Sequence, residues 1–276
     1  MKYLLIFAVI GAIIAIAFVY IQRNPPEEPI LPAEQYEVHF FDVGQGDCTL
    51  LDCGEYEVLI DGGPVDSDVT LKINDYVDGH LEAIIITHPH ADHIGDIRNV
   101  LRNFTVDALW KNTDTADTNV YRDVMENIKP EKVYLAVVGE NITVGPFSFA
   151  VLSSASGTDI NENSIVLELD TAGAKFLFMG DAGTVTERTL LLVNKITDID
   201  ILKIGHHGST SASSPWFIQT AAPEIAIYTA GIGNSYGHPN PSILALYKRL
   251  GVDVYGTDTY GDISVNVGTD NYTLNY

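Results

Sequence analysis

The chain has 276 residues, of which 46% are hydrophobic, and its 37 acidic and 15 basic residues give a formal net charge of −22. A chain of this length and hydrophobic content can bury the core of one domain or at most two, which excludes an intrinsically disordered protein. The negative charge repels polyanions, so nucleic acid is a disfavoured partner.

The first residues form an apolar segment. No charged residue lies from position 3 to position 21. At about 1.5 Å per residue, a helix of this length spans the hydrocarbon layer of a bilayer. We therefore expect residues 1–23 to form a single-pass membrane anchor. A cleaved signal peptide is the alternative, although the apolar run continues beyond the small residues that would mark a cleavage site.

A proline-rich stretch follows the apolar segment. Residues 24–35 contain the sequence NPPEEPILP, which is typical of a stiff, extended linker. Lys2 and Arg23 flank the apolar segment, so positive charge gives little indication of its orientation. We expect the rest of the chain to lie at the cell membrane, outside the cytoplasm, or to be secreted if the segment is removed.

Short strands and helices alternate along residues 36–276, which we expect to form one domain. The predicted strands lie at residues 38–43, 48–53, 58–61, 83–87, 133–137, 142–144, 147–152, 165–169, 175–179, 199–204, 225–228 and 253–255. The predicted helices lie near residues 69–77, 94–103, 119–128, 186–194, 215–221 and 241–250. Glycine-rich turns between the first three strands indicate that these strands form an antiparallel sheet. Two sheets sandwiched between helices satisfy the whole pattern, so the predicted fold class is α/β.

The most informative motif comes directly after the predicted strand at 83–87. The run HPHADH places His88, His90, Asp92 and His93 within six residues. Alternate residues of an extended segment point the same way, so His88 and His90 can bind one cation while Asp92 and His93 reach a second. Imidazole and carboxylate groups at this density are typical metal ligands. The sequence therefore predicts two metal ions side by side.

The same run resembles the HxHxDH motif of the metallo-β-lactamase superfamily. Five further segments narrow the resemblance to the hydrolase domain of the ComEC-type DNA-uptake proteins and their free-standing relatives. These segments are FFDVGQGD (40–47), LIDGG (59–63), MGDA (179–182), LKIGHHGS (202–209) and NSYGHP (234–239). The resemblance implies an αββα sandwich of the metallo-β-lactamase type for residues 36–276, and hydrolysis as its activity.

Further ligands are expected at the ends of two later strands. Asp181, in the MGDA segment, follows an apolar strand and should bridge the two cations. His206 and His207 also follow an apolar strand, and one of them should complete the second metal while the other contacts substrate. The flanking glycines permit an irregular backbone, so alternation does not decide between them. We take His206 as the ligand and His207 as the substrate contact.

One departure from the superfamily pattern concerns the first cation. The usual arrangement supplies another histidine before the bridging aspartate, yet no histidine lies between His93 and His206. The segment Asn161-Glu162-Asn163-Ser164 stands at the expected place and resembles the Asn-Ser segment of the ComEC-type branch. In this segment, Asn163 is the residue expected to support the metal ligands or to contact substrate. Oxygen or water in place of an imidazole favours harder cations, so both Zn²⁺ and Mn²⁺ stay open. The missing histidine also weighs against a true β-lactamase.

Three other residues are candidates for supporting roles. Asp61, in LIDGG, can orient a metal-binding imidazole as a hydrogen-bond acceptor. His238, in a Gly and Pro loop, can contact a phosphate or protonate a leaving oxygen, although it can equally stabilise the loop. Ser209 can donate to phosphate oxygens or simply begin a helix.

We therefore expect a membrane-anchored, binuclear metal-dependent hydrolase, in which Asp92 and His238 are the catalytic residues. A hydroxide held between the cations would attack a phosphodiester or another ester. We favour hydrolysis of a phosphodiester over the other interpretations. A DNA nuclease linked to DNA uptake, a hydrolase of non-phosphate esters and a non-catalytic binding module attached to the membrane are the alternatives.

Overall fold

The computed structural model describes residues 35–155 and 157–276. These residues belong to one unit, Gln35–Tyr276. The predicted anchor at residues 1–23 lies outside the described residues, as does all of the linker except Gln35. Within the described part of the chain, no helix combines the length and apolarity needed to cross a bilayer.

Eight strands form the first sheet, in the order β15-β14-β1-β2-β3-β4-β5-β6. The strands are β1 (Tyr36–Phe40), β2 (Thr49–Asp52), β3 (Glu57–Ile60), β4 (His80–Ile86), β5 (Thr105–Lys111), β6 (Val133–Leu135), β14 (Ile263–Val267) and β15 (Tyr272–Asn275). Strands β1, β2 and β3 pair antiparallel, as the sequence predicts. Strands β3 to β6 run parallel, so their carboxyl ends meet at one edge of the sheet.

Seven strands form the second sheet, in the order β13-β12-β11-β10-β9-β8-β7. The strands are β7 (Asn141–Val144), β8 (Phe147–Ser153), β9 (Val166–Asp170), β10 (Lys175–Phe178), β11 (Ile201–Lys203), β12 (Ile225–Tyr228) and β13 (Asp253–Gly256). Strands β7 to β10 pair antiparallel, whereas β10 to β13 run parallel. The carboxyl ends of β10 and β11 therefore lie side by side.

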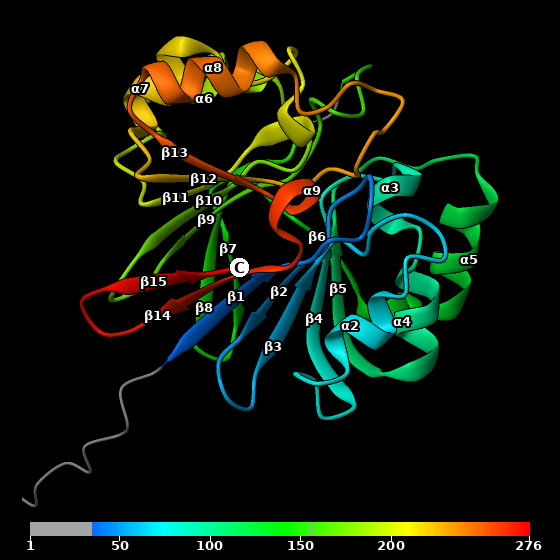
Figure 1. The fold of residues 1–276 in the computed structure, drawn as a ribbon. Coiled ribbons are helices and arrows are strands. Elements are labelled where there is room, and N and C mark those ends of the chain that lie inside the picture. Colours follow the sequence, from blue (N-terminus) through cyan, green and yellow to red (C-terminus); the bar gives the residue numbers. More distant parts are fainter. Residues whose placement is uncertain (1–34, 156) are drawn as a thin grey trace, which may run out of the picture. The chain divides into compact units, whose positions relative to one another are not determined.

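Helices cover the outer face of each sheet. The helices of the described residues are α2 (Val69–Ile73), α3 (Ala91–Ile94), α4 (Ile97–Asn103), α5 (Asn119–Asn127), α6 (Thr184–Leu192), α7 (Pro215–Ala221), α8 (Pro241–Arg249) and α9 (Thr257–Tyr260), with short 3₁₀ turns at η1 (Pro130–Lys132) and η2 (Gly205–Gly208). Helices α2, α4 and α5 lie beside β3 to β5, and helices α6, α7 and α8 lie over β10 to β13 (Figure 1).

Three hydrophobic cores separate these layers. Side chains alternate across each strand, so β3 contributes Val58 and Ile60 to the core between the sheets and Leu59 to the core under α2, α4 and α5. Leu177 of β10 packs likewise into the core beneath α6, α7 and α8. Four layers with three cores form an αββα sandwich, which confirms the predicted fold class.

The structure corrects several predicted elements. Strands β5, β14 and β15 were not predicted. The helix predicted near residues 94–103 is two helices, α3 and α4, separated by Gly95 and Asp96. The backbone N–H groups of these two residues donate to the carbonyls of Gly63 and Gly62, at 2.8 and 3.2 Å. The chain turns there because these bonds replace helical ones.

Candidate metal centre

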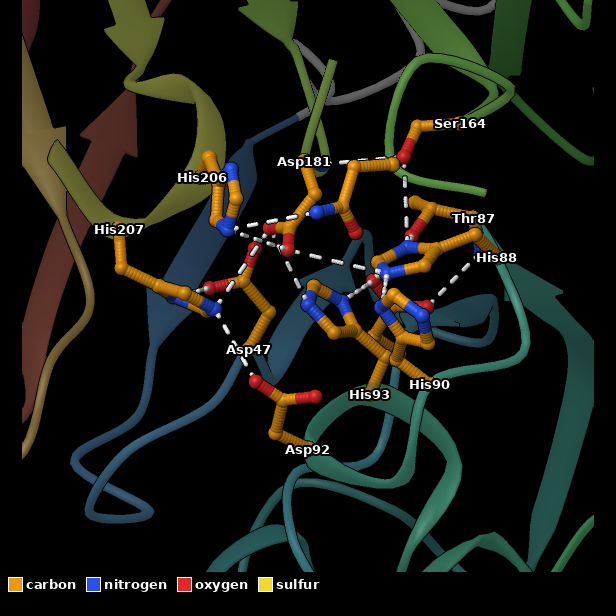
Figure 2. A network of polar contacts seen from close by, with 12 residues as sticks. Asp47, Thr87, His88, His90, Asp92, His93, Ser164, Asp181, His206 and His207 are labelled. Carbon is orange, nitrogen blue, oxygen red and sulfur yellow. Dashed lines mark hydrogen bonds and ion pairs between the residues drawn. The ribbon is translucent and has the colours of Figure 1, made fainter. Parts of the chain in front are cut away.

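Strand ends from both sheets bring the candidate site together. His88 follows β4 of the first sheet, whereas Asp181 and His207 follow β10 and β11 of the second. Parallel strands end at a common edge, so residues far apart in sequence converge there. Their side chains point toward one another in Figure 2, where the turn that carries His206 and His207 faces the loop that carries His88 to His93.

The first half of the histidine motif holds two imidazoles in contact. His88 Nε2 lies 3.0 Å from His90 Nδ1, so the two side chains converge as alternation predicts. His88 Nδ1 lies 3.1 Å from Thr87 Oγ1 and 3.3 Å from Ser164 Oγ. Burial and the neighbouring His93 hold the pKa of His88 well below its ordinary value. The ring is therefore neutral and can offer a nitrogen lone pair to a cation.

His93 is held between two carboxylates. Its Nδ1 lies 2.7 Å from Asp61 Oδ2, and its Nε2 lies 3.2 Å from Asp181 Oδ1. Asp61 in turn accepts hydrogen bonds from the Thr87 N–H and hydroxyl, at 2.8 and 2.7 Å. Asp61 thus has the supporting position predicted for it, because its contact with Nδ1 directs Nε2 toward Asp181.

His207 occupies the equivalent position on the other side. Its Nε2 lies 3.4 Å from Asp92 Oδ2 and 3.5 Å from Asp181 Oδ1. Its Nδ1 lies 2.9 Å from the Thr229 carbonyl and 3.1 Å from Asp47 Oδ1. The ring is fully buried, and its Nε2, like that of His93, is directed at Asp181.

Asp47 is itself supported by a buried lysine. Lys203 Nζ lies 2.8 Å from Asp47 Oδ2, and the Thr229 hydroxyl donates to Asp47 Oδ1. Both partners of the ion pair are almost inaccessible to solvent, with 3% and 6% of their side chains exposed. Lys203 lies in the LKIGHHGS segment, but sequence reasoning did not assign it a role. A lysine at the end of an apolar strand, within a predicted metal motif, was the signal.

The two histidines of the pair lie differently from what the sequence led us to expect. His206 Nε2 lies 3.7 Å from Asp181 Oδ2, whereas Nδ1 contacts Ser211 Oγ at 2.9 Å, and the side chain is 22% exposed. His207, by contrast, is buried with Nε2 among the aspartates. Both residues adopt left-handed backbone conformations, with φ of 49° and 52°. This kink after Gly205 directs His207 inward, which alternation along an extended strand could not anticipate.

The residues present fit divalent metal ions. Three buried atoms that lack hydrogen-bond partners converge here: His93 Nε2, Asp181 Oδ1 and His207 Nε2. Four groups of potential ligands have atoms within 4.8 Å of one another, and two of them are His88 with His93 and Asp181, and Asp92 with His93 and His207. Buried polar atoms without partners are costly, and imidazole and carboxylate are the ligands of Zn²⁺ and Mn²⁺.

The charges lead to the same conclusion. Burial opposes ionisation of Asp92 and Asp181, yet the nearby His207 and His93 lower the pKa of Asp92 to about 2 and that of Asp181 well below its ordinary value. Burial likewise opposes a charge on His207, yet Asp181 and Asp47 raise its pKa to about 10. The buried carboxylates therefore require positive charge at this position, which protons supply in the metal-free protein.

The segment that replaces the missing histidine contributes different residues from the one predicted. Asn163 faces away from the centre, because its amide donates to Asp114 Oδ2 and the Gly157 carbonyl, at 2.8 and 3.1 Å. Asn161 lines the pocket at the centre instead, and its Oδ1 is buried without a hydrogen-bond partner. Ser164 Oγ accepts from the Asp181 N–H at 3.1 Å and so joins this aspartate to His88.

Ser209 also differs from its predicted role. Its hydroxyl accepts hydrogen bonds from the backbone N–H and the hydroxyl of Ser211, at 3.2 and 3.0 Å. Ser211 contacts His206 in turn. Ser209 is buried and therefore supports the histidine turn rather than facing a substrate.

The centre opens into a pocket of about 370 Å³. Its lining consists of Gln45, His90, Ala91, Asp92, Asn161, Asp181, His206, His207, Tyr236 and His238. None of these residues is a lysine or arginine. The His238 ring lies 5.4 Å from the His206 ring, and its Nδ1 is buried without a partner. Burial and the neighbouring His206 and His207 lower the pKa of His238, so the ring is neutral at pH 7.

Comparison with known proteins identifies the family. The model of the metallo-beta-lactamase superfamily matches residues 41–231, which include every candidate metal ligand. The chain belongs to the metallo-β-lactamase superfamily. With the His and Asp cluster described above, this identifies a metal-dependent hydrolase of the superfamily.

The sequence relatives include a protein named as a competence protein. The chain is 32% identical over 187 residues to ComE operon protein 3 of Bacillus subtilis, a match that covers 66% of this chain and 24% of that protein. It is 25% identical over 244 residues to Competence protein ComA of Neisseria gonorrhoeae, covering 86% of this chain and 33% of that protein. The resemblance to the ComEC-type branch is confirmed, and the chain spans about a quarter to a third of these relatives.

Solved structures share the fold at low identity. The metallo-beta-lactamase fold protein YhfI of Bacillus subtilis has a TM-score of 0.58 and 14% identity, and the match covers 88% of this chain and all of that one. A diphosphatase of the PhnP family has a TM-score of 0.52 and 16% identity, covering 84% and 98%. These similarities show the fold alone.

Proposed function

We propose that the chain is a binuclear metal-dependent phosphodiesterase. The observation that carries this proposal is the convergence of His93, His207 and Asp181, each with a buried atom that makes no hydrogen bond, beside an open pocket that His207 and Asp181 line. Together with Asp92, these groups form a dense, buried ligand set that faces a space large enough for a small substrate.

The ligands divide between two cations. We assign His88, His90 and Asp181 to one cation, and His93, His207 and Asp92 to the other, with Asp181 shared. Two bound divalent cations would supply the Lewis acidity that activates water at neutral pH and neutralises charge developing on a phosphoryl group.

The charge of the pocket favours a diester over more highly charged phosphates. The pocket offers no lysine or arginine, and the chain as a whole carries −22. A phosphodiester brings one negative charge, whereas a monoester or a polyphosphate brings two or more, which a site without lysine or arginine accommodates less well. The imidazoles of His206 and His238 can donate hydrogen bonds to a singly charged phosphate.

His238 is positioned to assist the leaving group, and Asp92 to handle the proton of the attacking water. Asp92 Oδ2 contacts His207 and the residue lines the pocket, so its carboxylate can accept a hydrogen bond on the nucleophile's side. An anionic phosphate beside His238 would raise the pKa of that imidazole, because the charged ring gains a counter-ion. His238 can then donate a proton to the departing oxygen.

Cleavage of DNA is the second candidate function, since the chain resembles the ComEC-type branch and one sequence relative is named a competence protein. The acidic charge of this chain opposes it, because binding a polyanion requires many basic contacts. Hydrolysis of non-phosphate esters and simple binding would use the same pocket.

A substrate panel separates these functions. The full chain, loaded with Zn²⁺ or Mn²⁺, would be assayed on a dinucleoside monophosphate, duplex DNA, 4-nitrophenyl acetate and a β-lactam. We expect the highest kcat/KM on the small diester, and loss of that activity in Asp181→Asn. Asp117→Asn, whose side chain is 99% exposed, is the matched control. Duplex DNA cleaved more efficiently than any small diester would favour the nuclease instead.

We also propose that the apolar segment at residues 3–21 anchors the chain in a membrane, with the hydrolase domain outside the cytoplasm. The segment's length and lack of charge support this proposal.

A further inference from the structure

The pocket must bind its substrate largely without charged side chains. Its lining includes two aspartates and no lysine or arginine. Metal ions can fix a phosphate, but they do not distinguish one phosphodiester from another. Selectivity therefore depends on uncharged contacts at the rim of the pocket.

An exposed tyrosine provides such a contact. Tyr236 lines the pocket, and 69% of its surface is accessible to solvent. Its ring stacks on His238 with centroids 6.0 Å apart and planes 25° apart. The His238 ring is related in the same way to His207, at 6.3 Å and 28°. Three rings, whose planes differ by 25° and 28° from one to the next, thus extend from solvent to the metal centre.

The loop that carries this tyrosine is held in a fixed shape. The side-chain oxygen of Asn234 accepts from the backbone N–H groups of Tyr236 and His238, at 3.1 and 3.2 Å. Its amide group donates to the carbonyls of Gly231, at 2.9 Å, and His238. These bonds hold Tyr236 at the pocket, so little conformational entropy is lost when a ligand packs on its ring.

We propose that Tyr236 is a stacking surface for a planar aromatic group joined to the scissile phosphate, such as a nucleobase or an aryl ring. This inference rests on the proposed phosphodiesterase function, whose substrate class it narrows. Aromatic stacking requires no positive charge on the protein, which suits an acidic chain, and it adds affinity for any ligand with a flat π face. Tyr236 would therefore determine specificity.

The test compares variants on three diesters. The full chain, Tyr236→Ala, Tyr236→Phe and Ile232→Ala would be assayed on thymidylyl-thymidine, bis(4-nitrophenyl) phosphate and glycerophosphoglycerol. Ile232 is the control, because it is 83% exposed in the same connection but does not line the pocket. For Tyr236→Ala we expect KM for the aromatic diesters to rise roughly five- to a hundred-fold, with kcat changed less than about two-fold.

Tyr236→Phe keeps the ring and should retain wild-type KM, as should Ile232→Ala. KM for glycerophosphoglycerol, which has no aromatic group, should stay at its wild-type value in every variant. A larger effect on thymidylyl-thymidine than on the aryl diester would identify the nucleobase as the group recognised, and the reverse would identify the aryl ring. An equal rise in KM on all three diesters would overturn the inference but leave the phosphodiesterase function intact.

A binding measurement separates this inference from the catalytic proposal. A dinucleoside methylphosphonate is uncharged at phosphorus, so its binding by calorimetry reports uncharged contacts. We expect Tyr236→Ala to weaken this binding roughly five-fold or more, whether or not any diester is cleaved. Equal affinity of the wild type and Tyr236→Ala would exclude a stacking role. Weakened binding without cleavage of any diester would refute only the phosphodiesterase function.

Discussion

Two buried imidazoles of the metal centre are held by carboxylates, but the carboxylates are themselves held differently. Asp61, which contacts His93, accepts hydrogen bonds from the neutral Thr87. Asp47, which contacts His207, forms an ion pair with Lys203. A buried carboxylate that loses its counter-ion favours the protonated form, in which it no longer accepts the imidazole proton. The orientation of the His207 ring should therefore depend on the charge of Lys203, whereas that of the His93 ring should not.

Lys203→Met should weaken the binding of one of the two cations. Removal of the ammonium leaves Asp47 buried without a counter-ion and disturbs the orientation of His207. We expect the affinity for the more weakly bound cation to fall about 10- to 100-fold, while the other is retained. Elemental analysis after dialysis, followed by metal titration, measures this. Lys72→Met breaks a Lys–Asp pair of 2.9 Å outside the centre and should leave both cations bound.

Metal content should also distinguish the roles of His206 and His207. His207→Asn removes the nitrogen directed at Asp92 and Asp181, so the variant should lose a cation. His206→Asn removes a ring that faces the pocket and should keep both cations while lowering kcat. Full metal content in His207→Asn together with loss of a cation in His206→Asn would restore the assignment expected from the sequence.

At the scale of elements, the loop at residues 159–164 is attached to the amino end of α6. The Glu162 carboxylate accepts from the backbone N–H groups of Gly183, Val185 and Thr186, at 3.2, 3.2 and 2.9 Å. The cap residue of α6, Gly183, has no side chain to do this. Glu162 therefore caps the helix from another segment and keeps Ser164 against Asp181.

Glu162→Ala should lower the free energy of unfolding by about 1–2 kcal/mol, because three backbone donors lose their acceptor. Urea unfolding of the metal-free protein measures this without interference from metal binding. Glu162→Gln keeps one side-chain oxygen as an acceptor and should lose less stability than Glu162→Ala. Glu140→Ala, at an exposed position, is the control and should change stability little. An unchanged midpoint in Glu162→Ala would show that water replaces the carboxylate.

The sequence was most informative where a local pattern is sufficient. Alternation explains why His88 and His90 converge, and apolar runs bounded by glycine located most strands of both sheets. Strand β5 was missed because Asp107 and a buried Lys111 interrupt its apolar pattern, although Ala108 and Leu109 pack in the core. Tertiary pairing with β4 supplies what local propensity lacks.

The remaining differences arise from backbone conformation. The left-handed turn at His206 and His207 exchanges the directions of the two side chains. Asn161, rather than Asn163, reaches the pocket because Asp114 and Gly157 hold the Asn163 amide away from it. Neither effect has a signature in residue type or spacing, since each depends on hydrogen bonds between segments distant in sequence.

At the scale of the whole molecule, the stability of the metal-free protein should depend on pH through these buried groups. The pKa of His207 is about 10, above its ordinary 6.5, so its contribution is full below about pH 6.5 and is lost as pH rises toward 10. The pKa of Asp92 is about 2, below its ordinary 3.8, so its contribution is full above about pH 4 and is lost as pH falls toward 2.

These two groups should therefore make the metal-free protein lose stability as pH rises from about 6.5 toward 10, and as pH falls from about 4 toward 2. Bound cations compete with protons for the same atoms, so added Zn²⁺ or Mn²⁺ should stabilise the protein more as pH rises. Urea midpoints from pH 4 to pH 10, with chelator and with metal, measure both effects. A metal-free protein that gains stability from pH 7 to pH 10 would contradict the proposed charge balance.

The apolar segment at residues 3–21 sets the final expectation for the whole chain. A segment of this length buried in lipid is held by the hydrophobic effect, which salt does not screen, whereas an acidic domain attached through ionic contacts is released by salt. We therefore expect the full chain to stay in the membrane fraction after a high-salt wash and to enter solution only with detergent. Fractionation followed by immunoblotting measures this, with a peripheral protein of the same membrane as the control. Recovery of the intact chain in the salt wash would rule out the anchor, and recovery of a chain shortened by about 20 residues would favour the signal peptide.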